Sequence, residues 1–245
     1  MFREGRWILY YLLQWSSRER SAARYEVGGG RLRLLIEAEQ QPWCPELDGE
    51  VRVSSLQTGV LAGPVGSTVG QHRFTPEAVV REAQENVRLY TPHYGRIETR
   101  CRATDDPYSV VALWMIGYED GPHRSAEICI CEIFGRDVGD DRAAVGMGVH
   151  PFGDLHISDE FAAERVPIDA REFHVYAAEW TPGHVAFSID GEHLKTVGQS
   201  PSYPMQLMLS LYEFTKDDAG GRTITGAYPK EFVVDYVRGY RRVPG

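Results

Sequence analysis

Two glutamates stand out because they interrupt the otherwise apolar stretch 126–134. Side chains of a regular β-strand alternate between two faces, so Glu127 and Cys129 share one face and Glu132 falls on the other. One extra residue bulging out near Cys131 would bring both glutamates to the same face, and such bulges cluster beside active sites. Without a bulge, the same spacing is that of an edge strand with exposed glutamates.

Two carboxyl groups on one concave surface are the groups that glycosidic bond cleavage needs. In a retaining enzyme they lie about 5–5.5 Å apart, one attacking the sugar and the other donating a proton. The donor needs a raised pKa while the nucleophile stays ionised, and apolar flanks could supply both environments. Glu127 and Glu132 are therefore candidate catalytic residues for this chemistry.

Short strand patterns that would position this pair recur along the whole chain. Many short strands with Gly-rich turns between them indicate an all-β sandwich or barrel, here a single domain over residues 1–245. The run 7–13 also has the pattern of a strand, whereas 75–85 carries helix signals and is predicted to be a short helix, with a sheet edge as the alternative. The other predicted strands cover residues 31–36, 49–54, 96–103, 109–116, 127–134, 174–180, 185–189, 193–197, 205–212 and 232–240.

Composition excludes some partners. The net charge of −9 argues against nucleic acid and against an anionic membrane surface, since both require basic patches. No stretch approaches transmembrane length, and the N-terminus has no convincing signal peptide. The four cysteines, Cys44, Cys101, Cys129 and Cys131, lack zinc-site spacing and are predicted to be free thiols. Free thiols favour a reducing, cytoplasmic compartment; the alternative is a secreted protein whose leader was removed. We favour a monomer and leave the oligomeric state open.

Five motifs follow one another in the last two thirds of the chain. They are Tyr94-Gly-Arg-Ile-Glu98, Ala112-Leu-Trp-Met115, the Glu127 to Glu132 segment, Phe173 to Pro182 with Asp190-Gly191, and Val234 to Tyr240. In type and order these motifs resemble those of glycoside hydrolase family 16. The resemblance implies a concanavalin A-like jelly roll, a β-sandwich of two curved antiparallel sheets.

The resemblance implies a role for individual residues. Glu127 would be the nucleophile and Glu132 the general acid/base of a retaining hydrolase or transglycosylase acting on β-linked glucan or a related polysaccharide. Trp114 would stack on a sugar ring, although its apolar surroundings also fit a core residue. His150 would face the acid/base from a neighbouring strand, although a lone histidine is often structural.

Two further implications concern the substrate and a metal. Gln206 and Ser210, with Met208 between them, would line one face of the cleft. Asp235 matches the position of a structural calcium ligand on the convex side, whereas one carboxylate alone does not make an oxygen cage. No cofactor is expected for catalysis.

The chain departs from the family signature at its middle acid, where Cys129 stands in place of aspartate. A thiol beside two carboxylates stays neutral and cannot share a proton as a carboxyl group does. We therefore expect Cys129 to lie at the substrate site and to reduce or alter activity. Two other functions remain open, namely a non-catalytic glycan-binding module on the same fold and a structural sandwich without a sugar ligand.

Overall fold

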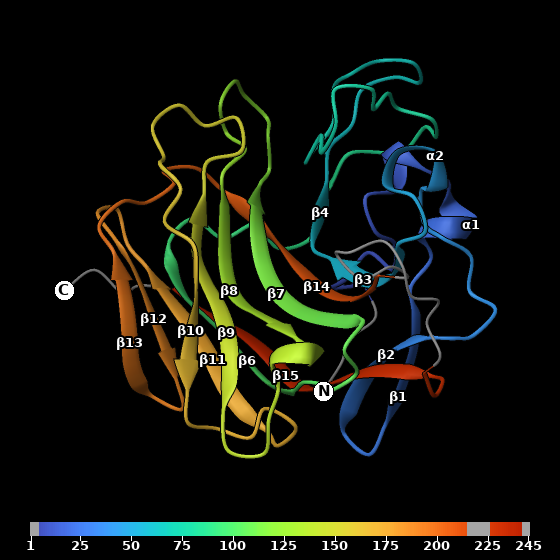
Figure 1. The fold of residues 1–245 in the computed structure, drawn as a ribbon. Helices are drawn as coiled ribbons and strands as arrows, with labels where there is room; N and C mark the ends of the chain where they lie inside the picture. The colour runs from blue at the N-terminus through green and yellow to red at the C-terminus, as the bar shows by residue number, and fades with distance from the viewer. Residues whose placement is uncertain (1–4, 215–225, 242–245) are drawn as a thin grey trace.

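Two antiparallel β-sheets make up the protein, of which the computed structural model describes residues 5–214 and 226–241. Seven strands form one sheet, in the spatial order β1 (Arg24–Gly28), β2 (Arg31–Ile36), β15 (Lys230–Tyr240), β6 (Gly95–Arg102), β11 (His174–Trp180), β12 (Val185–Ile189) and β13 (Glu192–Val197). Six form the other, in the order β10 (Ala162–Val166), β9 (Ala143–His150), β8 (Glu127–Phe134), β7 (Ser109–Gly117), β14 (Met205–Glu213) and β3 (Arg52–Gln57). Figure 1 shows the two layers, and the predicted jelly-roll sandwich is confirmed.

Few elements lie outside these sheets. A short strand pair joins β4 (Gly59–Val60) to β5 (Val87–Arg88). The helical turns are η1 (Leu13–Trp15), α1 (Arg18–Ser21), α2 (Pro45–Asp48) and η2 (Gly135–Asp137). None of the helices in the described part of the chain is long and apolar enough to cross a membrane.

The main core lies between the two sheets and follows from strand alternation. On β7, Val111, Leu113 and Met115 face inward and join residues of both sheets in one apolar cluster. The intervening side chains, such as Trp114, face the other side of the six-stranded sheet. β7 therefore reads as a continuous apolar run because both of its faces are covered.

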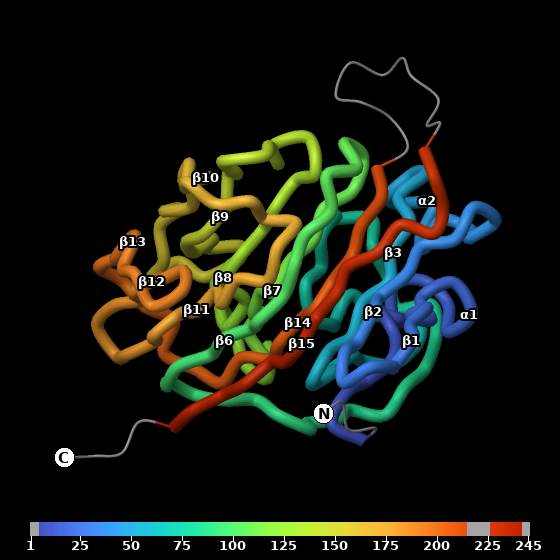
Figure 2. The backbone as a smooth tube through the Cα atoms, turned by 90° about the horizontal axis from the view of Figure 1, so that it is seen from below, coloured from blue at the N-terminus to red at the C-terminus, as the bar shows by residue number. Residues whose placement is uncertain are grey.

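A second apolar cluster covers part of that other, concave face. Segments from the first 80 residues pack there, with Trp15 and Trp43 almost completely buried against Trp114 and Met208. Figure 2 shows these N-terminal segments, with α1 and α2, gathered beside β3 at the end of the sandwich away from β12 and β13. Only the remainder of the concave face is left for a cleft.

Two local predictions were wrong. Residues 75–85 form no helix, only a turn in which the Ala78 amide donates to the Thr75 carbonyl at 3.1 Å. Ala78 and Val80 are buried in the concave-face cluster, so tertiary packing overrides local helix propensity. The run 7–13 is not a continuous strand either, because it makes isolated bridges at Ile8 and Tyr10 before η1 begins.

The remaining predicted strands are present with small shifts at their ends. The sequence patterns missed β1, β4, β5, β9 and β10. β9 carries Gly146 and Gly148, and glycines weaken a strand pattern. They are needed here because a Cβ at Gly146 would lie 2.5 Å from the Phe161 ring and 3.3 Å from the Glu132 Cβ atom.

Candidate active site

A β-bulge in β8 brings the two glutamates to one face. Leu113 on β7 pairs with Cys131, and the next residue, Trp114, pairs with Cys129, so Ile130 is the extra residue. Ile130 and Cys131 consequently both point into the core between the sheets. The bulge predicted near Cys131 is thus present, and it reverses the parity of the second half of the strand.

Glu127, Cys129 and Glu132 line a cleft of about 210 Å³ on the concave face. This volume is below the roughly 300–1,000 Å³ typical of small-molecule sites. The lining comes from β7, β8, β9 and β14 together with two N-terminal segments. Its other residues are Tyr11, His72, Val110, Ala112, Trp114, Phe134, His150, Tyr212 and Phe214.

His72, which the sequence patterns did not indicate, lies directly beside Glu127. Its Nδ1 atom is 3.3 Å from the Glu127 Oε1 atom, yet this buried nitrogen has no hydrogen-bond partner within the described residues. The imidazole stacks on Phe152 with ring centroids 4.3 Å apart and contacts Trp114 edge-on at 5.1 Å. These ring contacts hold His72 at the part of the cleft wall next to Glu127.

Burial sets the protonation of this end of the cleft. It raises the pKa of Glu127 to about 8, with a further contribution from the charge of Glu132. It raises the pKa of Glu119, which accepts a 2.6 Å hydrogen bond from the His72 amide, to about 7. It lowers the pKa of His72 to about 3. The imidazole is therefore neutral near pH 7, and Glu127 is a carboxyl group that holds a proton.

Glu132 has a different environment on the other side of the bulge. Burial raises its pKa, and the positive charge of a protonated His150 opposes that rise. His150 is oriented by Asp159, whose Oδ2 atom is 2.9 Å from Nδ1, and by stacking on Phe161. His150 therefore lies in the cleft, on β9, where the strand register pairs it with Glu127.

The other predicted substrate contacts are more deeply placed than expected. Trp114 lines the cleft, but it is only 7% exposed and its indole N–H donates to the Ser210 hydroxyl at 3.1 Å. Ser210 and Gln206 are fully buried and are not part of the lining. The structure thus does not bring these two side chains to a ligand, because the N-terminal segments cover their part of β14. Ser210 affects the cleft only indirectly, because its hydroxyl accepts the hydrogen bond that holds the Trp114 indole in place.

Cys129 occupies the predicted position between the glutamates. It is 3% exposed, and its Sγ atom lies 3.8 Å from the Gly146 carbonyl oxygen. Burial raises the pKa of the thiol, and the charges of Glu132 and Glu127 raise it further. The side chain is therefore a neutral thiol at the floor of the cleft.

Asp235 does not have the surroundings of a calcium ligand. It lies at a register shift in β15 and forms an ion pair with Arg100 on β6 at 2.6 Å. No group of three or more His, Cys, Asp or Glu residues able to hold a metal occurs in the described ranges. A guanidinium occupies the place where a cation would bind, so these side chains do not fit the metal that the resemblance implied.

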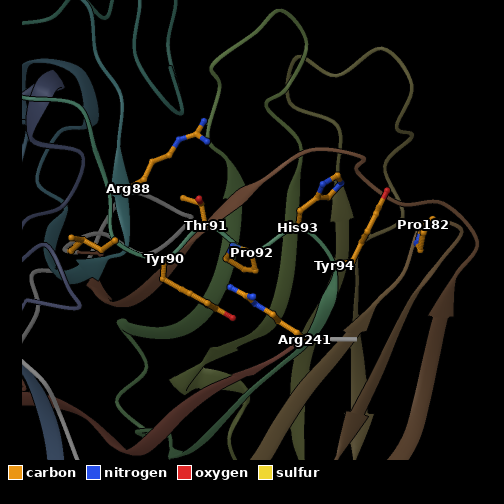
Figure 3. Close-up of a pocket in the computed structure, with 9 residues that line it drawn as sticks. Arg88, Tyr90, Thr91, Pro92, His93, Tyr94, Pro182 and Arg241 are labelled. Atoms are coloured by element: carbon orange, nitrogen blue, oxygen red, sulfur yellow. The ribbon is translucent and has the colours of Figure 1, made fainter. Parts of the chain in front are cut away.

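A larger pocket of about 590 Å³ lies near the ends of β6, β11 and β15, as Figure 3 shows. It is lined by Arg88, Leu89, Tyr90, Thr91, Pro92, His93, Tyr94, Pro182 and Arg241. This lining contains no carboxyl group. The pair of acids needed for hydrolysis is therefore found in the smaller cleft.

A comparison with models of known protein families shows to which family the chain belongs. The model of the glycosyl hydrolases family 16 matches residues 88–230, a range that contains Glu127, Glu132 and His150. The chain belongs to glycosyl hydrolase family 16. The match begins before β6 and ends where β15 begins, so the N-terminal segments over the concave face lie outside it.

Individual relatives within the family are distant. A β-glucanase from Rhodothermus marinus is 29% identical over 171 residues, which cover 61% of this chain and 58% of that protein. The solved GlcNAcα1-4Gal-releasing endo-β-galactosidase from Clostridium perfringens aligns with a TM-score of 0.81 at 27% identity, covering 98% of this chain and 59% of that one. The laminarinase from Rhodothermus marinus aligns with a TM-score of 0.66 at 23% identity over the whole chain and 93% of its own, which shows the fold. The chain thus spans less than two thirds of the first two of these relatives.

Proposed function

We propose that the protein is a retaining glycoside hydrolase or transglycosylase acting on β-linked glucan or a related polysaccharide. The observation that carries this proposal is the bulge at Ile130, which turns Glu127 and Glu132 toward one cleft. Two carboxyl groups on one face of a groove are what the double displacement of glycoside cleavage requires. Their raised pKa values are typical of a site built for proton transfer.

The chemistry divides between the two acids. Glu127 attacks the anomeric carbon and forms a glycosyl-enzyme ester, while Glu132 donates its proton to the departing sugar oxygen. Glu132 then removes a proton from water, or from the hydroxyl of a second sugar, and that oxygen displaces Glu127 from the anomeric carbon. Water gives hydrolysis and the sugar hydroxyl gives transglycosylation. His150 opposes the burial effect on Glu132 and so tunes the acid.

The names of the relatives suggest which glycans to test first. They include a β-glucanase, laminarinases, an endo-β-galactosidase and a Crh5 transglycosylase. We therefore propose a polysaccharide or oligosaccharide partner with β-linked glucose or galactose. Tyr212 and Phe214 at the cleft offer aromatic faces for sugar stacking.

The decisive experiment is an activity screen over laminarin, lichenan, xyloglucan, agarose and carrageenan, with the anomeric configuration of the product followed by NMR. We expect release of a product of retained configuration, and Glu127→Gln should abolish it. The matched control is Glu179→Gln, which changes an exposed glutamate on β11 and should leave turnover intact. Inverted product, or full activity in Glu127→Gln, would rule out the assigned roles.

A second candidate is a glycan-binding module with little or no turnover. Three features of the cleft favour it, namely the volume of only about 210 Å³, the neutral thiol of Cys129 and the protonated state of Glu127 near pH 7. Calorimetric binding of laminarin oligosaccharides without turnover, unchanged by Glu127→Gln, would support this alternative. Turnover that Glu127→Gln abolishes would exclude it.

A further inference from the structure

The ligand-free cleft holds the shared proton on the wrong carboxyl group for the proposed reaction. Between Glu127 and Glu132, the deeper burial of Glu127 gives it a pKa of about 8, so it is protonated near pH 7. A nucleophile must be ionised, and the proton is needed on the partner that serves as the acid. Some group must therefore stabilise the ionised form of Glu127 when the cleft is occupied.

His72 is placed to do this. Its Nδ1 atom lies 3.3 Å from the Glu127 Oε1 atom and, within the described residues, has no other group to bond. A buried polar atom without a partner is costly, so its persistence beside a reactive carboxyl group calls for an explanation. Hydrogen bonds at catalytic groups are often long in ligand-free structures and tighten when substrate binds.

The backbone around His72 is held in an unusual conformation. His72, Glu119 and Phe152 have φ angles of +50°, +58° and +50°, in the left-handed region that residues other than glycine rarely adopt. Glu119 accepts the His72 amide, and the Phe152 ring stacks on the imidazole. Three strained positions that meet at His72 are typical of a functional site.

We propose that His72, as a neutral imidazole carrying its proton on Nδ1, is a positioning residue that donates to Glu127 and so directs the shared proton to Glu132. The inference rests on the proposed function. It adds to that function the group that makes Glu127 the ionised nucleophile and Glu132 the proton donor. Neutrality matters because an imidazolium would form an ion pair with Glu127 and make it a poor nucleophile. Burial of the imidazole, which packs against the rings of Phe152 and Trp114, lowers its pKa and keeps it neutral.

Other titratable groups face Glu127 and bear on its charge. The charges of Glu132, Asp159 and Glu119 raise its pKa. The titratable groups around it come from its own strand, from the segments after β7 and β9, from β14 and from the N-terminal layer. The set is Glu132, Cys129, Glu119, Asp159, Tyr11 and Tyr212, with His150 paired across β9.

The first test removes the nitrogen and keeps the ring. His72→Phe preserves stacking on Phe152 but deletes the donor. We therefore expect kcat to fall roughly 10- to 150-fold, which corresponds to the free energy of one hydrogen bond to a charged group. KM should stay nearly unchanged. The acid limb of the kcat/KM profile should move to higher pH. His72→Asn restores a donor near the Nδ1 position and should recover part of the loss. His93→Phe, which alters a histidine whose ring lies tilted against Tyr94 in the pocket of Figure 3, is the matched control and should have no effect.

The second test needs no turnover. The ¹⁵N shifts of His72 in the wild-type protein report its tautomer, and we expect a neutral ring protonated at Nδ1 from pH 5 to 8. The ¹³C carboxyl shift of Glu127 should titrate at higher pH in His72→Phe than in wild type. A neutral ring protonated at Nε2, or a charged ring at pH 6, would overturn the proposal.

These readouts separate the two claims. Unchanged kcat and pH profile in His72→Phe would overturn the role of His72 and leave the hydrolase intact. No turnover on any glycan by wild type would defeat the hydrolase, and the tautomer of His72 would then decide the positioning role alone. The wild-type spectra remain decisive even if His72→Phe does not fold.

Discussion

The burial of Glu127 predicts that removing its charge stabilises the protein at alkaline pH. Its carboxyl group is protonated in the folded state up to a pKa of about 8, whereas the ordinary value is 4.5. Because the folded state holds this proton more tightly, stability falls as pH rises between those two values. Glu127→Gln has no such proton to lose, so its advantage should appear only as the pH increases.

The size of the effect follows from the difference of about 3.5 between the two pKa values. At about 1.36 kcal/mol for each pH unit, the upper limit is about 5 kcal/mol above pH 8. We expect about 2–4 kcal/mol, because water entering the cleft relieves part of the desolvation. The Glu127 side chain is only 13% exposed, so solvent screening reduces the effect little.

Urea denaturation at pH 5, 7 and 9 measures this difference. Wild type and Glu127→Gln should unfold with nearly equal free energies at pH 5, and the variant should be more stable at pH 9. Every other titrating group is common to both proteins, so the pH dependence of their difference isolates Glu127. Glu179→Gln, at an exposed site on β11, should show no pH-dependent gain. A gain for Glu127→Gln that is the same at pH 5 and pH 9 would refute the reasoning.

Two further predictions concern the remaining acid and the thiol. Glu132→Gln should lower kcat on polysaccharide by about 10²- to 10⁴-fold, but much less on an aryl glycoside with a good leaving group. Added azide should restore turnover of the aryl glycoside, with a glycosyl azide as the product. Equal losses on both substrates would contradict the acid/base role. Cys129→Asp should raise kcat severalfold, because a buried carboxyl group can share a proton with Glu127. The same change should lower the free energy of unfolding by roughly 1–3 kcal/mol. Steady-state kinetics and urea denaturation measure the two effects, and unchanged turnover would show that the thiol does not limit activity.

The sequence predicted the sandwich, and the placing of two glutamates on one face of it, because strand alternation is a local signal. The apolar runs on β7 and β8 gave both strands nearly to the residue. The parity conflict between Glu127 and Glu132 even predicted the bulge, since only an inserted residue reconciles two acids on one face. The structure places that insertion at Ile130.

The cleft walls could not be predicted in the same way. His72 lies in an irregular segment and carries no periodic signal, and its place beside Glu127 depends on contacts across 55 residues of chain. The family resemblance placed Gln206 and Ser210 at the cleft, and they do share one face of β14 with Tyr212, which lines it. They are covered by N-terminal segments whose packing no local pattern reveals. Long-range packing, rather than local propensity, decides these positions.

The N-terminal layer links stability to the chemistry of the site. Trp114 is held by Ser210, which in turn bonds Ser55 on β3, and His72 packs against the edge of Trp114. The same covering that buries Glu127 and raises its pKa therefore also supplies the imidazole that can lower the cost of ionising it. Opening this layer would relieve the burial of Glu127 but would also remove the imidazole that we propose as its donor. The acid pair and the layer above it consequently function as one unit, which is why the first 80 residues matter to a site whose acids lie on β8.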